Sequence, residues 1–364
     1  MSDLAFELDI SFKKENRKMF DVEDSLSKKA KRAIFEACKK TSLPPLEWYV
    51  PYRYISGNSG DYELVIETGS KLINTQSSYI TYVENGLGLF GFNNKKVNRF
   101  NAFLFKKKIR NRNFKGFVFY SHTARISTYN TMSKLGIPKE LIEEKDLGVI
   151  YPFTSELFNQ NKIEHKEKKE TNILFCSSTF SLKGGREALS AFKEFSKINK
   201  ASLTIVTDEK IVINEPNIKL MPFNLSSEDV ARLINSNDVI IHPTYFDSHS
   251  LFLIEALKLN KFIIATKTFA ISEIVRMSSK SILLDNPHKP YSKEFTANFL
   301  GTASEYIKDI SNCEEDIKLR RDILKALLSI NVKDFSCSNE MEPIQSLSSD
   351  YILQLWKSIL ARVN

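Results

Sequence analysis

The latter half of the chain alternates short apolar runs with amphipathic stretches. Stretches such as residues 187–198 and 226–236 place apolar side chains three and four apart, which is the interval of a helix. The runs between them have the composition of buried strands, and six occur, at residues 172–178, 202–208, 218–223, 238–244, 262–267 and 281–286. Strands that are apolar throughout and alternate with helices indicate a parallel, doubly wound sheet. This half is therefore predicted to form a Rossmann-like α/β domain.

The first half carries the same pattern less regularly. A second α/β domain accounts for it best, because helical stretches separate several strand-like runs. The helical stretches lie near residues 24–40, 95–112 and 122–135, and the strand-like runs at 63–68, 79–84, 116–121 and 147–152.

The length of 364 residues leaves room for two domains, since about 150 residues per domain is usual. The polar, charged run at 154–171 is typical of a linker. The last residues form an amphipathic helix that must pack on another surface. We therefore predict domains at 1–153 and 154–345, followed by a terminal helix at 346–364 that packs back on the first domain.

Cysteine usage and hydropathy exclude several classes of protein. The four cysteines show neither zinc-site nor disulfide-framework spacing; they are Cys38, Cys176, Cys313 and Cys337. The N-terminus lacks a cationic start followed by an apolar stretch, and no run approaches roughly 18 apolar residues. We expect a cytoplasmic protein that does not span a membrane.

The net charge of +8 belongs to the first half of the chain. Residues 1–150 contain 25 Lys and Arg against 17 Asp and Glu, whereas the remaining residues are neutral as a whole. Between Glu84 and Glu140 there are twelve basic residues and no acidic one. One face of the first domain should therefore be strongly positive.

The first candidate site follows the predicted strand at 172–178. Lys183, Gly184 and Gly185 occupy a short loop before a helix. Glycines there would let a phosphate approach free backbone N–H groups, and the lysine would add a positive charge. The spacing disfavours a P-loop ATPase and a nicotinamide dehydrogenase, because it fits neither fingerprint. A glycine pair also occurs in strand-turn-helix connections that bind nothing.

The second candidate site follows the predicted strand at 238–244. Asp247 lies in the polar loop and Glu255 in the next helix, near a strand end where open α/β sheets bind ligands. Two carboxylates there could accept hydrogen bonds from the hydroxyl groups of a ribose and a sugar. Glu273 starts a further helix, where its negative charge is favourable. The plainer alternative is that Asp247 and Glu273 only cap helices.

In order and spacing, residues from about 171 to 280 resemble the donor-binding domain of family 4 glycosyltransferases, which are retaining enzymes of GT-B architecture. The resemblance implies two Rossmann-like domains that face each other across a cleft, an acceptor-side domain and a nucleotide-sugar-binding domain. It rests on Lys183-Gly184-Gly185, Pro243-Thr244 through Glu255-Ala256, Ala265-Thr266, and Ser272-Glu273-Ile274-Val275.

By that resemblance, Lys183 binds the diphosphate of a sugar nucleotide and stabilises it as the leaving group. Glu255 holds the ribose hydroxyls, and Asp247 stands where the family has a glutamate facing the transferred sugar. No Asp-x-Asp motif is present, so we expect no metal cofactor. The other donor-side positions are Ser178, Gly184, Arg186, Thr244, Ser248, His249, Ser250, Leu251, Thr268, Phe269 and Ala270.

The chain departs from the family pattern in both donor-side loops. Ser178 replaces the arginine that precedes the lysine, so Arg186 is a candidate for the missing diphosphate contact. Asp247 is shorter than the family's glutamate by a methylene, and Ser248 and Ser250 replace glycines. These changes favour an altered donor, with a weakened or inactive enzyme as the alternative.

The first domain resembles the family's acceptor domains only loosely, and the usual N-terminal glycine-rich loop is not visible. Glu84, Asn85 and Gly86 follow a predicted strand and are expected to face the acceptor. His122 follows another strand, where it could contact the sugar or act as an acid–base group. A purely structural role for His122 is the alternative.

A basic stretch in the first domain interleaves cations with apolar and aromatic residues, which suits the surface of an anionic bilayer. The alternatives are a solvated basic helix and unspecific attraction to nucleic acid. No nucleic-acid-binding module accompanies the charge, so we do not expect nucleic acid as a partner. The cations predicted to face the membrane are Lys106, Lys107, Lys108, Arg110 and Arg112.

The predicted activity is transfer of a hexose, with retention, from a nucleotide diphosphate sugar to a saccharide or lipid-linked saccharide. The expected setting is lipopolysaccharide or capsule synthesis, with the protein bound peripherally to the inner face of the membrane. The rival hypothesis is a non-catalytic GT-B-like protein that binds a sugar nucleotide or a glycan.

Overall fold

The computed structural model describes residues 36–50, 63–158, 170–330 and 344–363. Most of the predicted helix near 24–40, most of the predicted linker and Cys337 lie outside these ranges. The chain divides into two compact units. The first unit comprises Met1–Pro152, Tyr291–Tyr306 and Ile352–Asn364, and the second comprises Phe153–Pro290 and Ile307–Tyr351.

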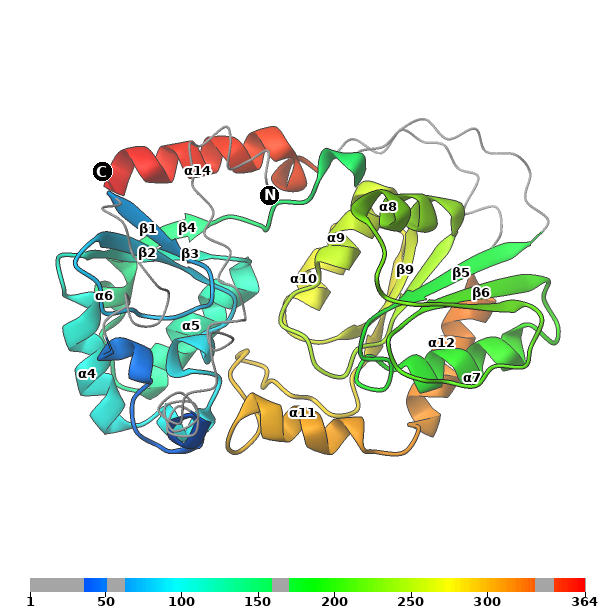
Figure 1. Ribbon diagram of the computed structural model, residues 1–364, viewed down its shortest axis with the longest axis horizontal. Coiled ribbons are helices and arrows are strands. Elements are labelled where there is room, and N and C mark those ends of the chain that lie inside the picture. The colour runs from blue at the N-terminus through cyan, green and yellow to red at the C-terminus, as the bar shows by residue number, and fades with distance from the viewer. Residues whose placement is uncertain (1–35, 51–62, 159–169, 331–343, 364) are drawn as a thin grey trace, which may run out of the picture. The chain divides into compact units, whose positions relative to one another are not determined.

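The first unit is built on a four-stranded parallel sheet whose strands follow chain order. Three helices cover one face of this sheet, and a C-terminal helix covers the other (Figure 1). The strands are β1 (Leu64–Glu67), β2 (Ser78–Val83), β3 (Phe114–Phe119) and β4 (Asp146–Val149). The helices are α4 (Arg99–Ile109), α5 (His122–Lys134) and α6 (Lys139–Glu143) on one face and α14 (Ser349–Val363) on the other. The second predicted α/β domain is therefore confirmed.

Aromatic side chains fill the core of the first unit on both faces of its sheet. Phe105 of α4 packs against Phe90 with ring centroids 5.5 Å apart. On the other face, Trp356 of α14 packs against Tyr82 of β2 at 5.4 Å. Because helices cover both faces, the strands are apolar almost throughout rather than alternating.

Residues 291–306 join the first unit, although the sequence assigned them to the domain at 154–345. An antiparallel bridge connects Asn93 with Thr302, and the Asn94 side chain donates a hydrogen bond to the Phe299 carbonyl at 2.8 Å. These contacts link segments about 200 positions apart in the chain. Apolar periodicity describes only local structure, so it did not reveal this return.

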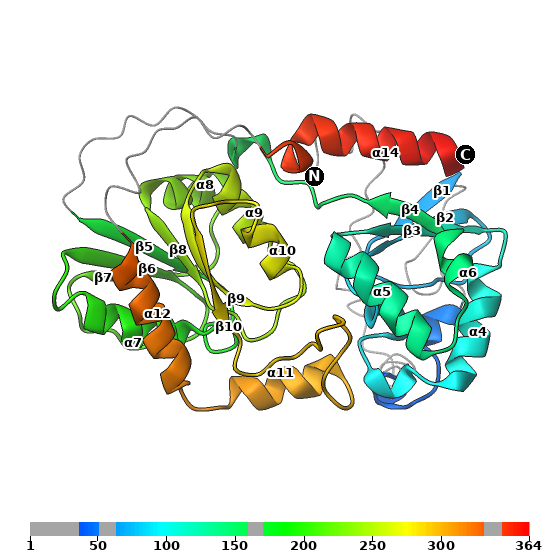
Figure 2. The same ribbon diagram turned by 180° about the vertical axis from the view of Figure 1, so that it is seen from behind.

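The second unit contains a six-stranded parallel sheet in the order β10-β9-β8-β5-β6-β7. Figure 1 and Figure 2 show α7 and α12 on one face and α8, α9 and α10 on the other. The strands are β5 (Thr171–Cys176), β6 (Ala201–Val206), β7 (Ile218–Met221), β8 (Val239–His242), β9 (Phe262–Lys267) and β10 (Ser281–Asp285). The helices are α7 (Gly185–Phe195), α8 (Ser227–Ser236), α9 (Leu251–Lys258), α10 (Ile271–Val275) and α12 (Ile317–Ser329), and α11 (Ala303–Ser311) spans the boundary between the units. All six predicted strands are confirmed.

Residues 36–40 are helical, and single 3-10 turns also occur. They are η1 (Leu46–Trp48), η2 (Gly88–Phe90), η3 (Asn94–Lys96), η4 (Glu156–Phe158) and η5 (Gln345–Leu347).

The strand order of the second unit defines where its topology reverses. From β5 the chain builds outward through β6 and β7, and it then crosses to β8 and builds in the opposite direction through β9 and β10. Ligands of open α/β sheets bind beyond the carboxyl ends of the strands at such a point. The loops that follow β5 and β8 are therefore the first place to look for a site.

Candidate functional site

Lys183 and Asp247 meet at this reversal point. Lys183 comes from the loop after β5 and Asp247 from the loop after β8. The Lys183 ammonium donates a hydrogen bond to Asp247 Oδ2 at 2.6 Å and another to the Phe246 carbonyl at 3.0 Å. The side chains remain 16% and 17% exposed, so a ligand can still reach the pair.

The surroundings of Asp247 keep this carboxylate ionised. Burial alone would raise the pKa of Asp247, but the nearby Lys183 ammonium and His242 together hold it well below its usual range. His242 Nε2 lies 3.5 Å from Asp247 Oδ2. Burial lowers the pKa of His242 although Asp247 opposes this, so the imidazole is neutral near pH ~7. The site thus combines a negative carboxylate with a positive ammonium.

Gly184 brings the two loops into close contact, and Gly185 packs against its own loop. Gly184 has φ +70°, and a Cβ there would lie 2.3 Å from the Pro243 carbonyl oxygen. A Cβ on Gly185 would lie 2.3 Å from the Phe180 ring. The loop containing Lys183 can approach the β8 loop so closely only because Gly184 lacks a side chain.

Gly184 and Gly185 do not offer their own N–H groups to a phosphate. The Gly184 N–H donates to the Ser181 carbonyl at 3.3 Å, and the Gly185 N–H donates to the Phe180 carbonyl at 2.9 Å. The turn consumes both donors internally. The side chain of Lys183 is therefore the group of this motif best suited to a phosphate.

Helix capping does not explain Asp247. The N-cap of α9 is Ser250, whose Oγ accepts a hydrogen bond from the Leu253 N–H at 3.4 Å. The N-cap of α10 is Ala270, with Glu273 in its first turn. The alternative that Asp247 caps the following helix is therefore wrong, and its carboxylate faces Lys183 instead.

Glu255 is a half-buried acid whose carboxyl group has no hydrogen-bond or ion-pair partner among the described residues. It lies on α9, where its backbone carbonyl accepts a hydrogen bond from the Leu259 N–H at 3.1 Å. Burial raises the pKa of Glu255 to about 7, and the Lys258 charge offsets this only partly. Cys176 at the end of β5 lies in its field, because burial and the Glu255 charge together raise the pKa of the thiol to about 12. A half-buried acceptor of this kind, on the helix that follows β8, suits ligand hydroxyl groups.

The loop after β9 carries the third group of predicted donor-side residues. Phe269 is buried with φ +37°, a backbone conformation that non-glycine residues rarely adopt. The Thr268 hydroxyl is buried and has no hydrogen-bond partner among the described residues. Ala270 is fully buried at the start of α10.

Most of the predicted residues in the loop after β8 are buried or form hydrogen bonds within that loop. The Thr244 hydroxyl donates to the Phe246 carbonyl at 3.1 Å, and Ser248 is buried. Burial lowers the pKa of His249 to about 4, although the Asp247 and Glu273 charges oppose this. Leu251 is 49% exposed at the start of α9.

Arg186 lies on α7, but its guanidinium is occupied at a different place. It donates to the Cys313 carbonyl at 2.6 Å and to Ser181 Oγ at 2.9 Å. The bond to Cys313 ties α7 to the connection between α11 and α12, and neither bond involves Lys183. Ser178 is half-buried in the loop after β5. The structure therefore does not bring Arg186 into the place of the missing arginine.

Sequence reasoning missed His242 and Cys176 as members of the site. Both end buried strands of the second unit, and the electrostatic contacts above connect them to Asp247 and Glu255. The signal was available, because each is the last residue of a strand on either side of the reversal point.

The predicted acceptor-side residues of the first unit divide into inward and outward groups. The Asn85 side chain is buried, accepts from the Leu87 N–H at 2.8 Å and donates to the Tyr291 hydroxyl at 3.3 Å. Gly86 lies so close to α5 that a Cβ would lie 2.8 Å from the Ser127 carbonyl. Asn85 and Gly86 thus hold their loop in place. Glu84 is half-buried, and His122 is exposed at the start of α5.

The five predicted membrane-facing cations do not share one environment. Lys107, Arg110 and Arg112 are exposed, whereas Lys106 and Lys108 are half-buried. Lys108 lies over the Tyr49 ring, 5.6 Å from its centroid. Two phenylalanines of the same helix are strongly exposed, Phe100 at 62% and Phe103 at 68%.

The described residues offer neither a metal-binding cluster nor a helix that could cross a membrane. They contain no group of three or more His, Cys, Asp and Glu side chains that could hold a metal ion. None of their helices has the length and apolar content that crossing a bilayer requires.

Comparison with known proteins gives a family match and similar folds. The model of the family described as "Glycosyl transferases group 1" matches residues 158–296. A trehalose-6-phosphate synthase studied for glycosyltransfer with retention is similar at 8% identity and a TM-score of 0.52, over 84% of this chain and 74% of that one. The GtfA/B complex is similar at 9% identity and a TM-score of 0.52, over 79% and 53%. Alr3699/HepE of Anabaena, in complex with UDP and glucose, has 14% identity and a TM-score of 0.46, over 82% and 78%. A search of curated proteins found no match.

Proposed function

We propose that this chain is a group 1 glycosyltransferase that transfers a sugar, with retention of configuration, from a nucleotide diphosphate sugar. The match of the group 1 glycosyltransferase model to residues 158–296 supports this. The observation that carries the proposal is the meeting of Lys183 and Asp247 at the reversal point of the second sheet. An ammonium group there can bind the diphosphate and stabilise the charge that develops as it leaves.

Two acids would hold the sugar nucleotide on either side of the diphosphate. Asp247 stays ionised next to Lys183, where it can accept hydrogen bonds from the hydroxyls of the transferred sugar. The Glu255 carboxyl group has no hydrogen-bond or ion-pair partner among the described residues, and the ribose hydroxyls would satisfy it. The buried hydroxyl of Thr268, also without a partner there, would gain one from the bound donor.

We further propose a saccharide or lipid-linked saccharide as acceptor, in the synthesis of lipopolysaccharide or capsule at a membrane surface. The exposed cations Lys107, Arg110 and Arg112 and the exposed Phe100 and Phe103 support this, because cations and aromatic rings together favour an anionic bilayer. Replacing Lys106, Lys107, Lys108, Arg110 and Arg112 by Gln should release the protein from anionic vesicles and leave donor binding unchanged.

A screen of nucleotide diphosphate sugars tests the central proposal. Binding is followed by thermal shift, because a ligand of the folded state raises its apparent stability. Turnover is followed by release of the nucleoside diphosphate. We expect at least one donor to bind and to be hydrolysed or transferred by the wild type and to be neither bound nor consumed by Lys183→Ala. A donor that binds without any turnover would favour a binding protein over an enzyme.

A further inference from the structure

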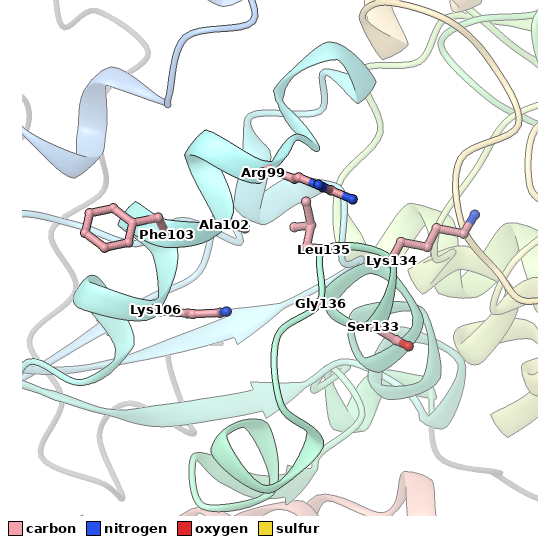
Figure 3. Close-up of a pocket in the computed structure, with 8 residues that line it drawn as sticks. All are labelled: Arg99, Ala102, Phe103, Lys106, Ser133, Lys134, Leu135 and Gly136. Carbon is pink, nitrogen blue, oxygen red and sulfur yellow. The ribbon is translucent and has the colours of Figure 1, made fainter.

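A pocket of about 490 Å³ lies in the first unit, between α4 and the turn that follows α5 (Figure 3). Arg99, Lys106 and Lys134 line it together with the apolar residues Ala102, Phe103 and Leu135. No acidic residue contributes to its lining. The pocket therefore combines positive charge with apolar surface.

Two of the three cations are not neutralised. Arg99 and Lys106 enter no ion pair with any residue that the structure describes. Lys134 is partly committed, since its ammonium donates to Thr296 Oγ1 at 2.6 Å. Lys134 also interacts with the charge of the exposed Glu294. Hydrogen bonds from Ser292 and from the backbone of Glu294 lower the pKa of this carboxyl most, and the Lys134 charge lowers it further. Arg99 and Lys106 are thus the cations best placed to take an anion.

The side chains leave room for a ligand. Figure 3 shows Lys106 reaching from α4 toward the turn that carries Gly136, and Arg99 lying beside Leu135, whereas Phe103 and Lys134 point outward. A Cβ on Gly136 would meet no atom within 4 Å, so this wall of the pocket is open. A guanidinium matches two oxygens of a phosphate at once, and an ammonium adds a point charge.

We propose that this pocket binds a phosphate monoester or diester, with Arg99 and Lys106 as its ligands. The exposed rings of Phe103 within the lining and Phe100 nearby suit an apolar portion of the same molecule. A phosphate of this kind occurs in a phospholipid headgroup and in small soluble phosphates. The proposal does not depend on the donor site, because all of these residues belong to the first unit.

The test compares two double variants of the first unit that lose the same charge. Arg99→Gln with Lys106→Gln removes the two pocket cations, and Lys357→Gln with Arg362→Gln removes two exposed cations of α14 that lie outside the pocket. Binding of inorganic phosphate is measured by calorimetry at constant ionic strength. Sedimentation is measured with vesicles made of equal parts phosphatidylglycerol and phosphatidylcholine. Thermal melts establish that both variants are folded.

We expect the pocket variant to bind roughly tenfold or more weakly than the wild type, and the control variant to change much less. Binding of inorganic phosphate alone would identify small phosphates as the ligand, and binding of vesicles alone would identify a lipid headgroup. Equal losses in the two variants, or no binding of either probe by the wild type, would overturn the proposal. In the case of equal losses the attraction would be a diffuse effect of charge.

Discussion

The Lys183 ammonium lies 2.6 Å from Asp247 Oδ2, although the two residues are 64 positions apart in the chain. The positive charge proposed for the donor diphosphate is therefore paired with an acid before the donor arrives. A diphosphate must either share Lys183 with Asp247 or displace it. This competition makes the roles of the two residues separable by experiment.

Lys183→Ala is expected to lower the rate of sugar transfer by about 100-fold or more, because it removes the charge that stabilises the leaving diphosphate. Lys183→Arg keeps the charge and should retain part of the rate. The matched control is Lys197→Ala, which removes an exposed lysine just beyond the same helix α7. Initial rates with the donor found in the screen decide the matter, and equal rates for Lys183→Ala and the control would exclude Lys183 from the reaction.

Asp247→Asn should tighten the binding of the nucleoside diphosphate product and lower the rate of transfer from the donor. It removes a negative charge that competes with phosphate for Lys183, so the product should bind about tenfold more tightly. It also weakens the acceptor of hydrogen bonds proposed for the sugar, so transfer should fall. Calorimetric titration with a panel of nucleoside diphosphates measures the first effect. Weaker product binding in this variant would show that Asp247 supports the lysine rather than competing with the ligand.

Glu255→Gln should stabilise the protein at alkaline pH while it impairs donor binding. Burial raises the pKa of Glu255 from 4.5 to about 7. Because the folded-state pKa is the higher one, the stability that this carboxyl contributes is present below the unfolded-state pKa and is lost as the pH rises through about 7. The variant should therefore gain about 1–3 kcal/mol in the free energy of unfolding, relative to wild type, between pH ~5 and ~8.

Denaturant unfolding at the two pH values measures this difference. Glu228→Gln, at an exposed position in the first turn of α8, is the control that is unfolded at the same two pH values. An Glu255→Gln variant whose effect is the same at both pH values would mean that the carboxyl is solvated in the folded protein.

The sequence predicts the strands and the convergence of the two loops because both follow from local patterns. Apolar runs mark the ends of β5 and β8, and parallel strands carry their carboxyl ends to one edge, so Lys183 and Asp247 are expected near each other. The roles of Gly184 and Arg186 could not be predicted in this way. The first depends on contact with Pro243 and the second on carbonyl groups of the α11–α12 connection, and spacing within a motif contains no information on either.

The exposed phenylalanines of α4 are expected to contribute a part of membrane binding that does not depend on salt, unlike the part contributed by the cations. Phe100→Ala with Phe103→Ala should weaken sedimentation with anionic vesicles at low and at high salt, because insertion of apolar rings is not screened. Ile126→Ala, at a 46% exposed position of α5, is the matched apolar control. Vesicle binding that the phenylalanine variant leaves intact would assign the association to the cations alone.

Gly184→Ala should destabilise the second unit and impair donor binding together. At φ +70° any side chain costs about 1 kcal/mol, and here a Cβ would also lie 2.3 Å from the Pro243 carbonyl oxygen, so a total loss of about 2–4 kcal/mol is expected. Gly91→Ala is the control, because Gly91 has φ +65° but no atom within 4 Å of the added Cβ. Calorimetry should therefore show only the backbone cost for Gly91→Ala.

Relief of the clash in Gly184→Ala must move the loop that carries Lys183 away from the β8 loop, so the remaining folded protein should bind the donor more weakly. Equal melting shifts in the two variants would show that the contact with Pro243 does not hold the two loops together.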